Sequence, residues 1–316
     1  MRFVVIMDPP ETVIVDQDTS FALMIEAQER GHRVEHCRPG DLYLDGGRLF
    51  ARVRSAHMQR VRERPIALGE AEDVCLHEVD AIWVRKDPPF DSGYLYCTLL
   101  LDTVKTDTFV LNDPNGLRAA NEKLYACRFP ELMPKTLVAS EKARIKRFVA
   151  SVGGRAVIKP LDGAGGEGVM TLTEGDLNLN AIIELTTHHG RRLAMVQEFL
   201  PAVREGDKRI LLLDGQLLGA ILRVPQQGDV RSNIHVGGSV VQAKVTEEER
   251  RIIETVAPSL REDGLYFVGL DVIGGKLTEV NVTSPTGIQQ MTRLDGVNYP
   301  AQVIAWIEAR VAGLNG

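Results

Sequence analysis

The chain has 316 residues, of which 44% are hydrophobic and 25% charged, a composition typical of soluble globular proteins. This length predicts about two or three domains with well-buried cores. The net charge of −6 excludes a nucleic-acid-binding protein that relies on an overall positive field. An anionic ligand would therefore need a local cluster of cations.

The four cysteines are too widely spaced for a zinc motif or a disulfide framework; they are Cys37, Cys75, Cys97 and Cys127. They are typical of reduced thiols in the cytoplasm. No apolar run approaches the roughly 20 residues of a membrane span. The apolar run that begins the chain stops at Asp8, which is too short for the core of a signal peptide. We therefore expect a cytoplasmic protein with neither a membrane nor a nucleic acid as partner.

Residues 1–122 alternate the patterns of strands and helices. The strands are predicted over 2–7, 33–37, 81–84 and 108–111, with a helix over 19–30. This alternation is typical of a mainly parallel sheet with helices on its faces. The arginine-rich segment 45–80 shows little periodicity, and we interpret it as a surface excursion.

Residues 123–199 have the pattern of a small α+β unit. Helices are predicted over 140–152, with Ser140 as its N-cap, and near 178–188. Strands are predicted over 156–159, 169–172 and 192–199. We expect this unit to be a separate subdomain.

Residues 200–316 begin with a hairpin, 209–213 and 216–223, that turns at Asp214-Gly215. The polar segment 225–239 follows, and its length favours a functional loop. A capping box at Thr246 then predicts a helix, after which come strands over 265–271 and 276–283 and a helix from Pro300. The fold class predicted is thus α/β and α+β: an N-terminal, mainly parallel α/β domain followed by a two-part module.

A glycine cluster over 163–168 matches the pattern G-x-G-x-x-G through Gly163, Gly165, Gly166 and Gly168. A dinucleotide fold would require a helix after this loop. The residues that follow, 169–173, are β-branched and lack a helical period, so we reject that reading. A glycine loop between two strands favours a flap over nucleotide phosphates, with a flexible hairpin tip as the alternative. Lys159 precedes the loop and is long enough to reach a phosphate.

Three oxygen-bearing side chains lie late in the chain. Glu279 and Asn281 are two apart on one strand and so share a face. Asp271 precedes them across Gly274-Gly275, and a two-residue turn would put it on the other face. We therefore predict a three-residue loop or a glycine bulge that places Asp271 opposite Leu277. Two carboxylates and an amide suit Mg²⁺ or Mn²⁺, although a solvated hairpin would explain them equally well.

Cations are scattered along the second and third parts of the chain: Lys123, Lys159, Lys208, Arg209, Arg223 and Arg231. An acidic protein that binds ATP must gather such residues locally. The run 195–201 is a strand that ends at a proline, which is consistent either with a core strand or with a hinge beside an adenine site.

The order of these features resembles the ATP-grasp superfamily, and longer motifs narrow the resemblance to the bacterial glutathione synthetases. These motifs extend from end to end of the chain: 7–9, 18–21, 85–91, 121–124, 159–163, 206–209 and 281–286. The resemblance implies that ATP phosphorylates the C-terminal carboxylate of γ-glutamylcysteine. The amine of glycine then attacks the acyl phosphate, which yields glutathione, ADP and phosphate.

The resemblance also implies residue roles. ATP would be bound by Lys123, Lys159, the flap glycines, Glu198, Phe199, Leu200 and Asp207; Mg²⁺ by Asp271, Glu279 and Asn281. Arg209, Arg223 and Arg231 would act on the anionic substrate or the transferring phosphoryl group. Ser284, Thr286 and Asn233 would seat the substrate, and residues 225–239 would form a lid. Family members commonly assemble, so a homo-oligomer is expected.

Three other functions remain as alternatives. One is another ATP-grasp amino-acid ligase, such as a D-alanine–D-alanine ligase. The second is a non-catalytic ATP-binding module, which the presence of both lysines and all three candidate metal ligands disfavours. The third is a dinucleotide-dependent oxidoreductase, which the missing helix after the glycine loop disfavours.

Overall fold

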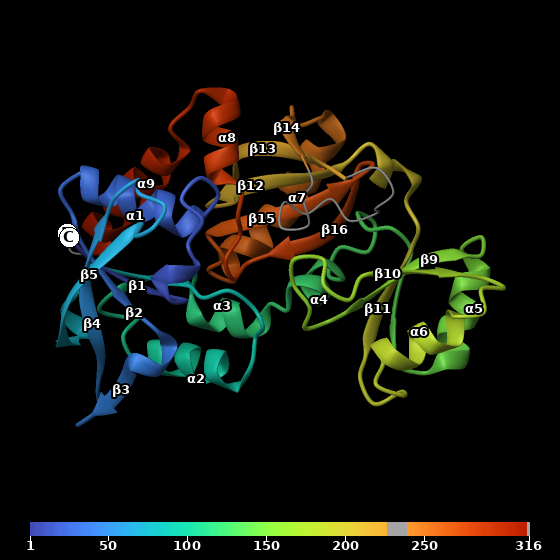
Figure 1. Cartoon of the computed structure of the whole chain (residues 1–316), viewed down its shortest axis with the longest axis horizontal. Helices are drawn as coiled ribbons and strands as arrows, with labels where there is room; N and C mark the ends of the chain where they lie inside the picture. Colours follow the sequence, from blue (N-terminus) through green and yellow to red (C-terminus); the bar gives the residue numbers. More distant parts are fainter. Residues whose placement is uncertain (226–238, 315–316) are drawn as a thin grey trace.

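The computed structural model describes residues 1–225 and 239–314. They form three sheets that follow one another along an elongated molecule (Figure 1). Most of the expected loop 225–239, including Arg231 and Asn233, lies outside the described residues. Within the described ranges, no helix combines the length and apolar character needed to cross a membrane.

The first sheet contains seven strands in the order β3-β4-β2-β1-β6-β7, with β5 paired to β4. The strands are β1 (Arg2–Met7), β2 (Arg33–Cys37), β3 (Leu42–Asp45), β4 (Arg48–Met58), β5 (Ile66–Cys75), β6 (Ala81–Arg85) and β7 (Phe109–Leu111). The four strands β2, β1, β6 and β7 run parallel. This part of the sheet confirms the predicted N-terminal α/β architecture.

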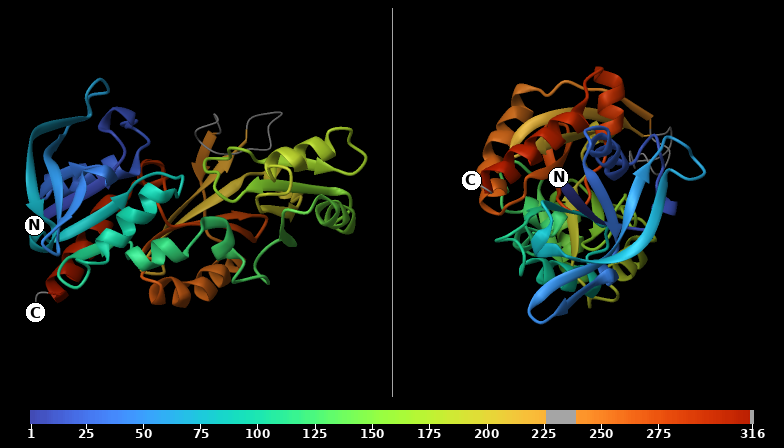
Figure 2. Two further views of the ribbon diagram at one scale, coloured as in Figure 1. Left: turned by 90° about the horizontal axis from the view of Figure 1, so that it is seen from below. Right: turned by 90° about the vertical axis from the view of Figure 1, so that its left-hand side faces the viewer.

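The alternation of side chains along β1 explains why helices cover both faces of the first sheet. Phe3 and Val5 pack into one hydrophobic cluster, which includes α1 (Thr19–Glu29) and α9 (Tyr299–Leu314). Val4 and Ile6 pack into another, with α2 (Ser92–Leu101) and α3 (Pro114–Ala119). The last helix therefore returns to the first sheet, and the two chain ends lie at the same end of the molecule (Figure 2).

The interpretation of residues 45–80 as a surface excursion is wrong. Most of this segment forms β4 and β5, which extend the first sheet in the antiparallel direction. Leu49, Ala51 and Val53 are buried and alternate with the half-buried Phe50 and the exposed Arg52 and Arg54. The arginines occupy the solvent face, and this masked the two-residue period.

The second sheet contains four strands in the order β10-β9-β11-β8. They are β8 (Thr136–Ala139), β9 (Arg155–Pro160), β10 (Met170–Thr173) and β11 (Ala194–Glu198). Helices α5 (Lys142–Ser151) and α6 (Leu179–Thr186) cover one side and share a separate hydrophobic cluster with the strands. This separate core supports a subdomain over 123–199, whose boundaries stay a prediction. Ser140 is not the N-cap of α5; Glu141 occupies that position without a side-chain hydrogen bond.

The third sheet is antiparallel, in the order β14-β13-β12-β15-β16. Its strands are β12 (Asp207–Leu213), β13 (Gln216–Val224), β14 (Ser239–Gln242), β15 (Phe267–Ile273) and β16 (Lys276–Asn281). The accompanying helices are α4 (Glu122–Ala126), α7 (Glu247–Glu262) and α8 (Ile288–Asp295), and the short 3-10 helices of the chain are η1 (Pro10–Thr12), η2 (Pro39–Asp41), η3 (Leu76–Glu78) and η4 (Pro201–Arg204). The predicted hairpin is confirmed: Asp214 and Gly215 both have positive φ, as a tight two-residue turn requires.

Candidate active site

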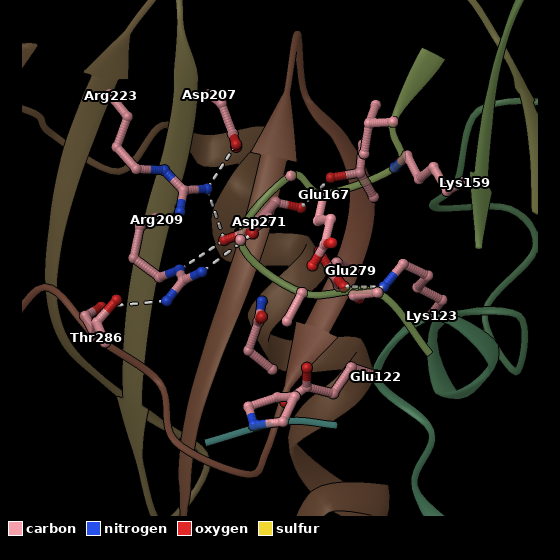
Figure 3. A pocket seen from close by; sticks show the side chains of 18 of the residues that line it. Glu122, Lys123, Lys159, Glu167, Asp207, Arg209, Arg223, Asp271, Glu279 and Thr286 are labelled. Carbon is pink, nitrogen blue, oxygen red and sulfur yellow. Dashed lines mark hydrogen bonds and ion pairs between the residues drawn. The ribbon is translucent and has the colours of Figure 1, made fainter. Parts of the chain in front are cut away.

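A cavity of about 490 Å³ lies where the three sheets meet. Arg85 and Ser20 line it from the first part of the chain, Lys159 from the second sheet and Asp271 and Glu279 from the third. Cations and carboxylates therefore converge from elements far apart in the sequence (Figure 3). A cavity between sheets into which such polar groups converge is the expected place for a binding site.

The three candidate metal ligands share one face of the third sheet. Asp271 pairs directly with Glu279, and Asn281 lies two residues further along β16. The prediction that the three side chains share one face is thus confirmed, but the predicted three-residue loop or glycine bulge is wrong. Gly274 and Gly275 form a two-residue turn, and a bulge at Thr278 shifts the register so that Asp271 faces Glu279 rather than Leu277.

Two arginines hold Asp271: Arg209 of the adjacent strand β12 and Arg223 of β13, one strand further. Arg209 donates from Nε to Oδ1 at 2.6 Å and from Nη2 to Oδ2 at 3.1 Å. Arg223 Nη2 lies 3.0 Å from Oδ1. Burial alone would raise the pKa of Asp271, but the two guanidinium groups outweigh it and hold that pKa well below its usual range. The carboxylate is therefore ionised at neutral pH.

Asp207 shares Arg223 with Asp271. The Arg223 Nη2 atom donates to Asp207 Oδ2 at 2.5 Å. Burial raises the pKa of the Asp207 carboxyl to about 6; Arg223 opposes this rise and Asp271 adds to it. The described contacts thus link Asp207 to the arginine cluster, whereas its predicted position near a ribose stays a prediction.

Lys123 lies in the short helix α4, which begins after the N-cap Asn121. Its ammonium donates to the carbonyl of Gly163 at 2.5 Å and lies 3.1 Å from Glu279 Oε1. The Asn121 side chain also donates to Leu161 O at 3.0 Å. One short helix therefore connects the glycine loop to the candidate metal ligands.

Lys159 extends into the same cavity from β9 (Figure 3). Its Nζ atom donates to Gln197 Oε1 at 2.8 Å. Burial lowers the pKa of the Lys159 ammonium, while the Glu279 carboxylate opposes this effect and Lys123 reinforces it. The two lysines predicted from the sequence thus lie on the same cavity.

The glycine loop joins β9 to β10, two antiparallel neighbours, so that a strand rather than a helix follows it directly. This confirms the rejection of the dinucleotide fold. Gly163, Gly165 and Gly166 line the cavity, whereas Gly168 is not among its lining residues. Backbone N–H groups of such a loop can approach an anion closely because no Cβ atoms intervene.

The predicted adenine residues Glu198, Phe199 and Leu200 all line the cavity at the end of β11. The Arg155 guanidinium lies 3.7 Å from the centroid of the Phe199 ring. The backbone N–H groups of Glu198 and Phe199 donate to Lys135 O and Arg155 O. Among the described residues, the N–H of Leu200 makes no such bond.

The loop after β16 supplies the predicted substrate residues. Ser284 and Thr286 line the cavity, and Thr286 O accepts from Arg209 Nη1 at 3.2 Å. Arg231 and Asn233, by contrast, lie outside the described residues.

Several further polar residues line the cavity although the sequence motifs that contain them predicted no role for them. Arg85 is buried and donates to Ser20 Oγ and to Pro285 O, both at 3.0 Å. Glu122 and Gln197 also line the cavity. Arg85 and Gln197 each follow an apolar run, and this is the signal that could have identified them, because buried polar groups need partners.

Two family models match the chain. The model of the prokaryotic glutathione synthetase N-terminal domain matches residues 1–118, and that of the prokaryotic glutathione synthetase ATP-grasp domain matches residues 122–296. A glutathione synthetase of Gloeobacter violaceus is 49% identical over an alignment of 313 positions that covers 97% of this chain and 96% of the relative. The glutathione synthetase of Thermosynechococcus vestitus is 46% identical over an alignment of 317 positions, gaps included, that covers 97% of this chain and 99% of the relative.

Solved structures share the fold at low sequence identity. The D-cycloserine synthetase DcsG has a TM-score of 0.65 at 16% identity, over 98% of this chain and 99% of that one. The macrocyclase MdnC of Microcystis aeruginosa has a TM-score of 0.66 at 15% identity, over 98% and 100%. The family models and the full-length relatives agree with this architecture, and the chain belongs to the prokaryotic glutathione synthetase family of ATP-grasp ligases.

Proposed function

We propose that this ligase joins γ-glutamylcysteine to glycine with ATP, by way of an acyl phosphate. The observation that carries the proposal is the cavity in which four cations, Lys123, Lys159, Arg209 and Arg223, surround an oxygen-rich face of the third sheet. Nucleotide phosphates need such a cluster in a protein whose net charge is −6.

The chemistry requires activation of a carboxylate, because at neutral pH this group is a poor electrophile. An oxygen of the C-terminal carboxylate of γ-glutamylcysteine attacks the γ-phosphorus of ATP, and ADP leaves. The amine of glycine then attacks the acyl carbon and loses a proton, and inorganic phosphate leaves with the former carboxylate oxygen. Positioning and charge stabilisation are the main contributions a protein makes to such transfers.

The cations have distinct positions for these steps. We assign Lys123 and Lys159 to the ATP phosphates, since they flank the glycine loop. Arg209 and Arg223 would meet the transferring phosphoryl group, and Arg231 would join them from the undescribed segment. Because these four described side chains are held by hydrogen bonds, they need little reorganisation during the reaction.

The donor set fits Mg²⁺ or Mn²⁺. Asp271, Glu279 and Asn281 offer only oxygen donors from one face, and the Asn281 amide nitrogen donates to Gly269 O, which leaves its carbonyl oxygen as the ligand atom. The described residues contain no group of three His, Cys, Asp or Glu side chains for a metal, so the amide is essential to this assignment. When bound, the ion would neutralise charge on the phosphates.

The remaining assignments concern the nucleoside, the substrates and the exclusion of water. Glu198, Phe199 and Leu200 would bind the adenine, with Asp207 near the ribose. Ser284, Thr286 and Asn233 would seat the peptide and glycine. The glycine flap and residues 225–239 would exclude water, which would otherwise hydrolyse the acyl phosphate.

We further propose that the protein is a cytoplasmic homo-oligomer. The four cysteines are free thiols, as a reducing compartment favours. Light scattering of the purified protein measures the assembly, and a mass equal to one chain would contradict it.

ADP release tests the proposal most directly. The protein is mixed with Mg²⁺, ATP, γ-glutamylcysteine and glycine, and each component is omitted in turn. We expect ADP release to require both substrates and to match glutathione formation in amount. Release only with a different amino-acid pair would keep the ligase mechanism and reject the substrates. ATP binding without release for any pair would favour a non-catalytic module.

Two variants then test the assigned roles. Asp271→Asn should lower kcat by at least a hundredfold, because it removes a candidate metal ligand. Lys159→Ala should chiefly raise the KM for ATP. Retention of full activity by either variant would reject the corresponding assignment.

A further inference from the structure

We propose that Gln197 is a positioning residue that holds the Lys159 ammonium in place for the nucleotide phosphates without neutralising its charge. This proposal rests on the assignment of Lys159 to ATP binding. It begins from a chain of three hydrogen bonds among β8, β9 and β11, the neighbouring strands of the second sheet.

Thr136 begins the chain. Its hydroxyl donates to Pro134 O at 2.8 Å. Because a hydroxyl has a single proton, Thr136 Oγ1 must act as the acceptor toward Gln197 Nε2, which lies 3.2 Å away. The Gln197 amide is thereby oriented with its nitrogen toward Thr136.

The other end of the amide agrees with this orientation. The Gln197 oxygen faces Lys159 Nζ at 2.8 Å. An ammonium can only donate, so the reversed amide would place two donors against each other. Gln197 is 2% exposed, and burial of its side chain makes the exchange of this hydrogen bond for water costly. The position of the Lys159 ammonium therefore depends on Gln197, whose amide orientation is in turn determined by Thr136.

The neutrality of Gln197 distinguishes Lys159 from the other cations of the cavity. Lys123 contacts Glu279, and Arg209 and Arg223 contact Asp271, so each of these charges is partly balanced by a carboxylate. Among the described residues, no carboxylate lies within ion-pair distance of Lys159. Its one described hydrogen bond leaves two of the three ammonium protons for a ligand.

This arrangement predicts that substitutions can separate the effect of the position of Lys159 from the effect of its uncompensated charge. Gln197→Met keeps the size of the side chain but removes the acceptor. Gln197→Glu keeps an acceptor near Lys159 but cancels the charge and removes the donor to Thr136. Thr136→Val removes the hydroxyl, and Thr136→Ser is its matched control.

The experiment measures the Kd of ATP and of inorganic tripolyphosphate by calorimetry, together with steady-state kinetics. Gln197→Met and Gln197→Glu should weaken both ligands by about tenfold or more. Thr136→Val should weaken both by about threefold, and Thr136→Ser should match the unmodified protein. The KM for γ-glutamylcysteine and kcat should change little, whereas a general loss of structure would alter all parameters.

The outcomes distinguish a failure of the Lys159 assignment from a failure of the positioning role of Gln197. If Lys159→Ala leaves the Kd of tripolyphosphate unchanged, the assignment of Lys159 itself is wrong. If Lys159→Ala weakens tripolyphosphate but Gln197→Met and Thr136→Val do not, the positioning role is wrong. If the Gln197 variants weaken ATP but not tripolyphosphate, Gln197 acts on the nucleoside rather than on Lys159, and the proposal is overturned.

Discussion

The side-chain amide of Asn112 forms hydrogen bonds with both the N–H and the carbonyl group of Phe267: Oδ1 accepts from Phe267 N at 2.8 Å, and Nδ2 donates to Phe267 O at 2.9 Å. The same amide accepts from Tyr266 N and donates to Val282 O, each at 2.9 Å. Asn112 follows β7 of the first sheet, whereas its partners lie in or beside β15 and β16 of the third. One buried residue therefore joins two of the three sheets that border the cavity.

Asn112→Ala should destabilise the protein by about 3 kcal/mol, because the buried backbone groups lose their partners. Urea unfolding followed by the fluorescence of Trp83 and Trp306 measures this change. Asn178→Ala is the matched control, since Asn178 is exposed and makes no capping hydrogen bond through its side chain. Equal effects of the two substitutions would contradict the role of Asn112.

Glu122 connects α4 to the loop that follows the candidate metal ligands. Its Oε1 atom accepts from Val282 N at 3.0 Å, Thr283 N at 3.1 Å and Thr283 Oγ1 at 2.8 Å. Glu122→Gln preserves a carbonyl acceptor and should change kcat/KM for γ-glutamylcysteine by less than about threefold. Glu122→Ala releases the loop that contains Ser284 and should lower it by about tenfold or more. A loss in Glu122→Gln as large as that in Glu122→Ala would indicate instead that the negative charge itself is required, because both variants lack it.

Gly165 and Gly168 allow the glycine flap to be tested with a matched pair. Both have positive φ, so alanine at either position adds backbone strain of about 1–2 kcal/mol. A Cβ atom at Gly168 would also lie 2.8 Å from Pro160 Cγ, whereas one at Gly165 would meet nothing within 4 Å. Gly168→Ala should therefore raise the KM for ATP more than Gly165→Ala does. Equal values in the two variants would show that the contact with Pro160 is unimportant.

His36 should make stability depend on pH. Burial lowers the pKa of this imidazole, although the nearby Asp8 carbonyl opposes the effect. The unfolded chain therefore binds more protons than the folded one below the usual histidine pKa of about 6.5. The stability that neutral His36 contributes is present above that pH. It is lost as the pH falls from the usual histidine pKa toward the lowered pKa of His36 in the folded protein.

Unfolding free energies of the unmodified protein and of His36→Gln, measured between pH 5 and pH 8, test this expectation. The unmodified protein should lose stability relative to the variant on acidification, by up to about 1.4 kcal/mol per pH unit. His57→Gln, at an exposed site, is the control, and its curve should run parallel to that of the unmodified protein. A parallel curve for His36→Gln would contradict the prediction.

Local features of this protein could be predicted from the sequence because short-range forces determine them. Asp214-Gly215 forms its tight turn since these residues tolerate positive φ. The capping box between Thr246 and Glu249 forms at the start of α7 because both partners lie within one turn. The same holds for the glycine loop and for the shared face of Glu279 and Asn281.

Other features depended on contacts between distant segments. The bulge at Thr278 brings Asp271 opposite Glu279, and its place in the strand is decided by packing and hydrogen bonding across the third sheet rather than by the glycine turn. Strands β4 and β5 carry so many charges on their solvent face that only pairing within the sheet reveals them as strands. The hydrogen bonds of Asn112, Glu122 and Gln197 join residues far apart in the chain, so the sequence alone determined which polar groups exist, and only the tertiary structure decided which of them meet.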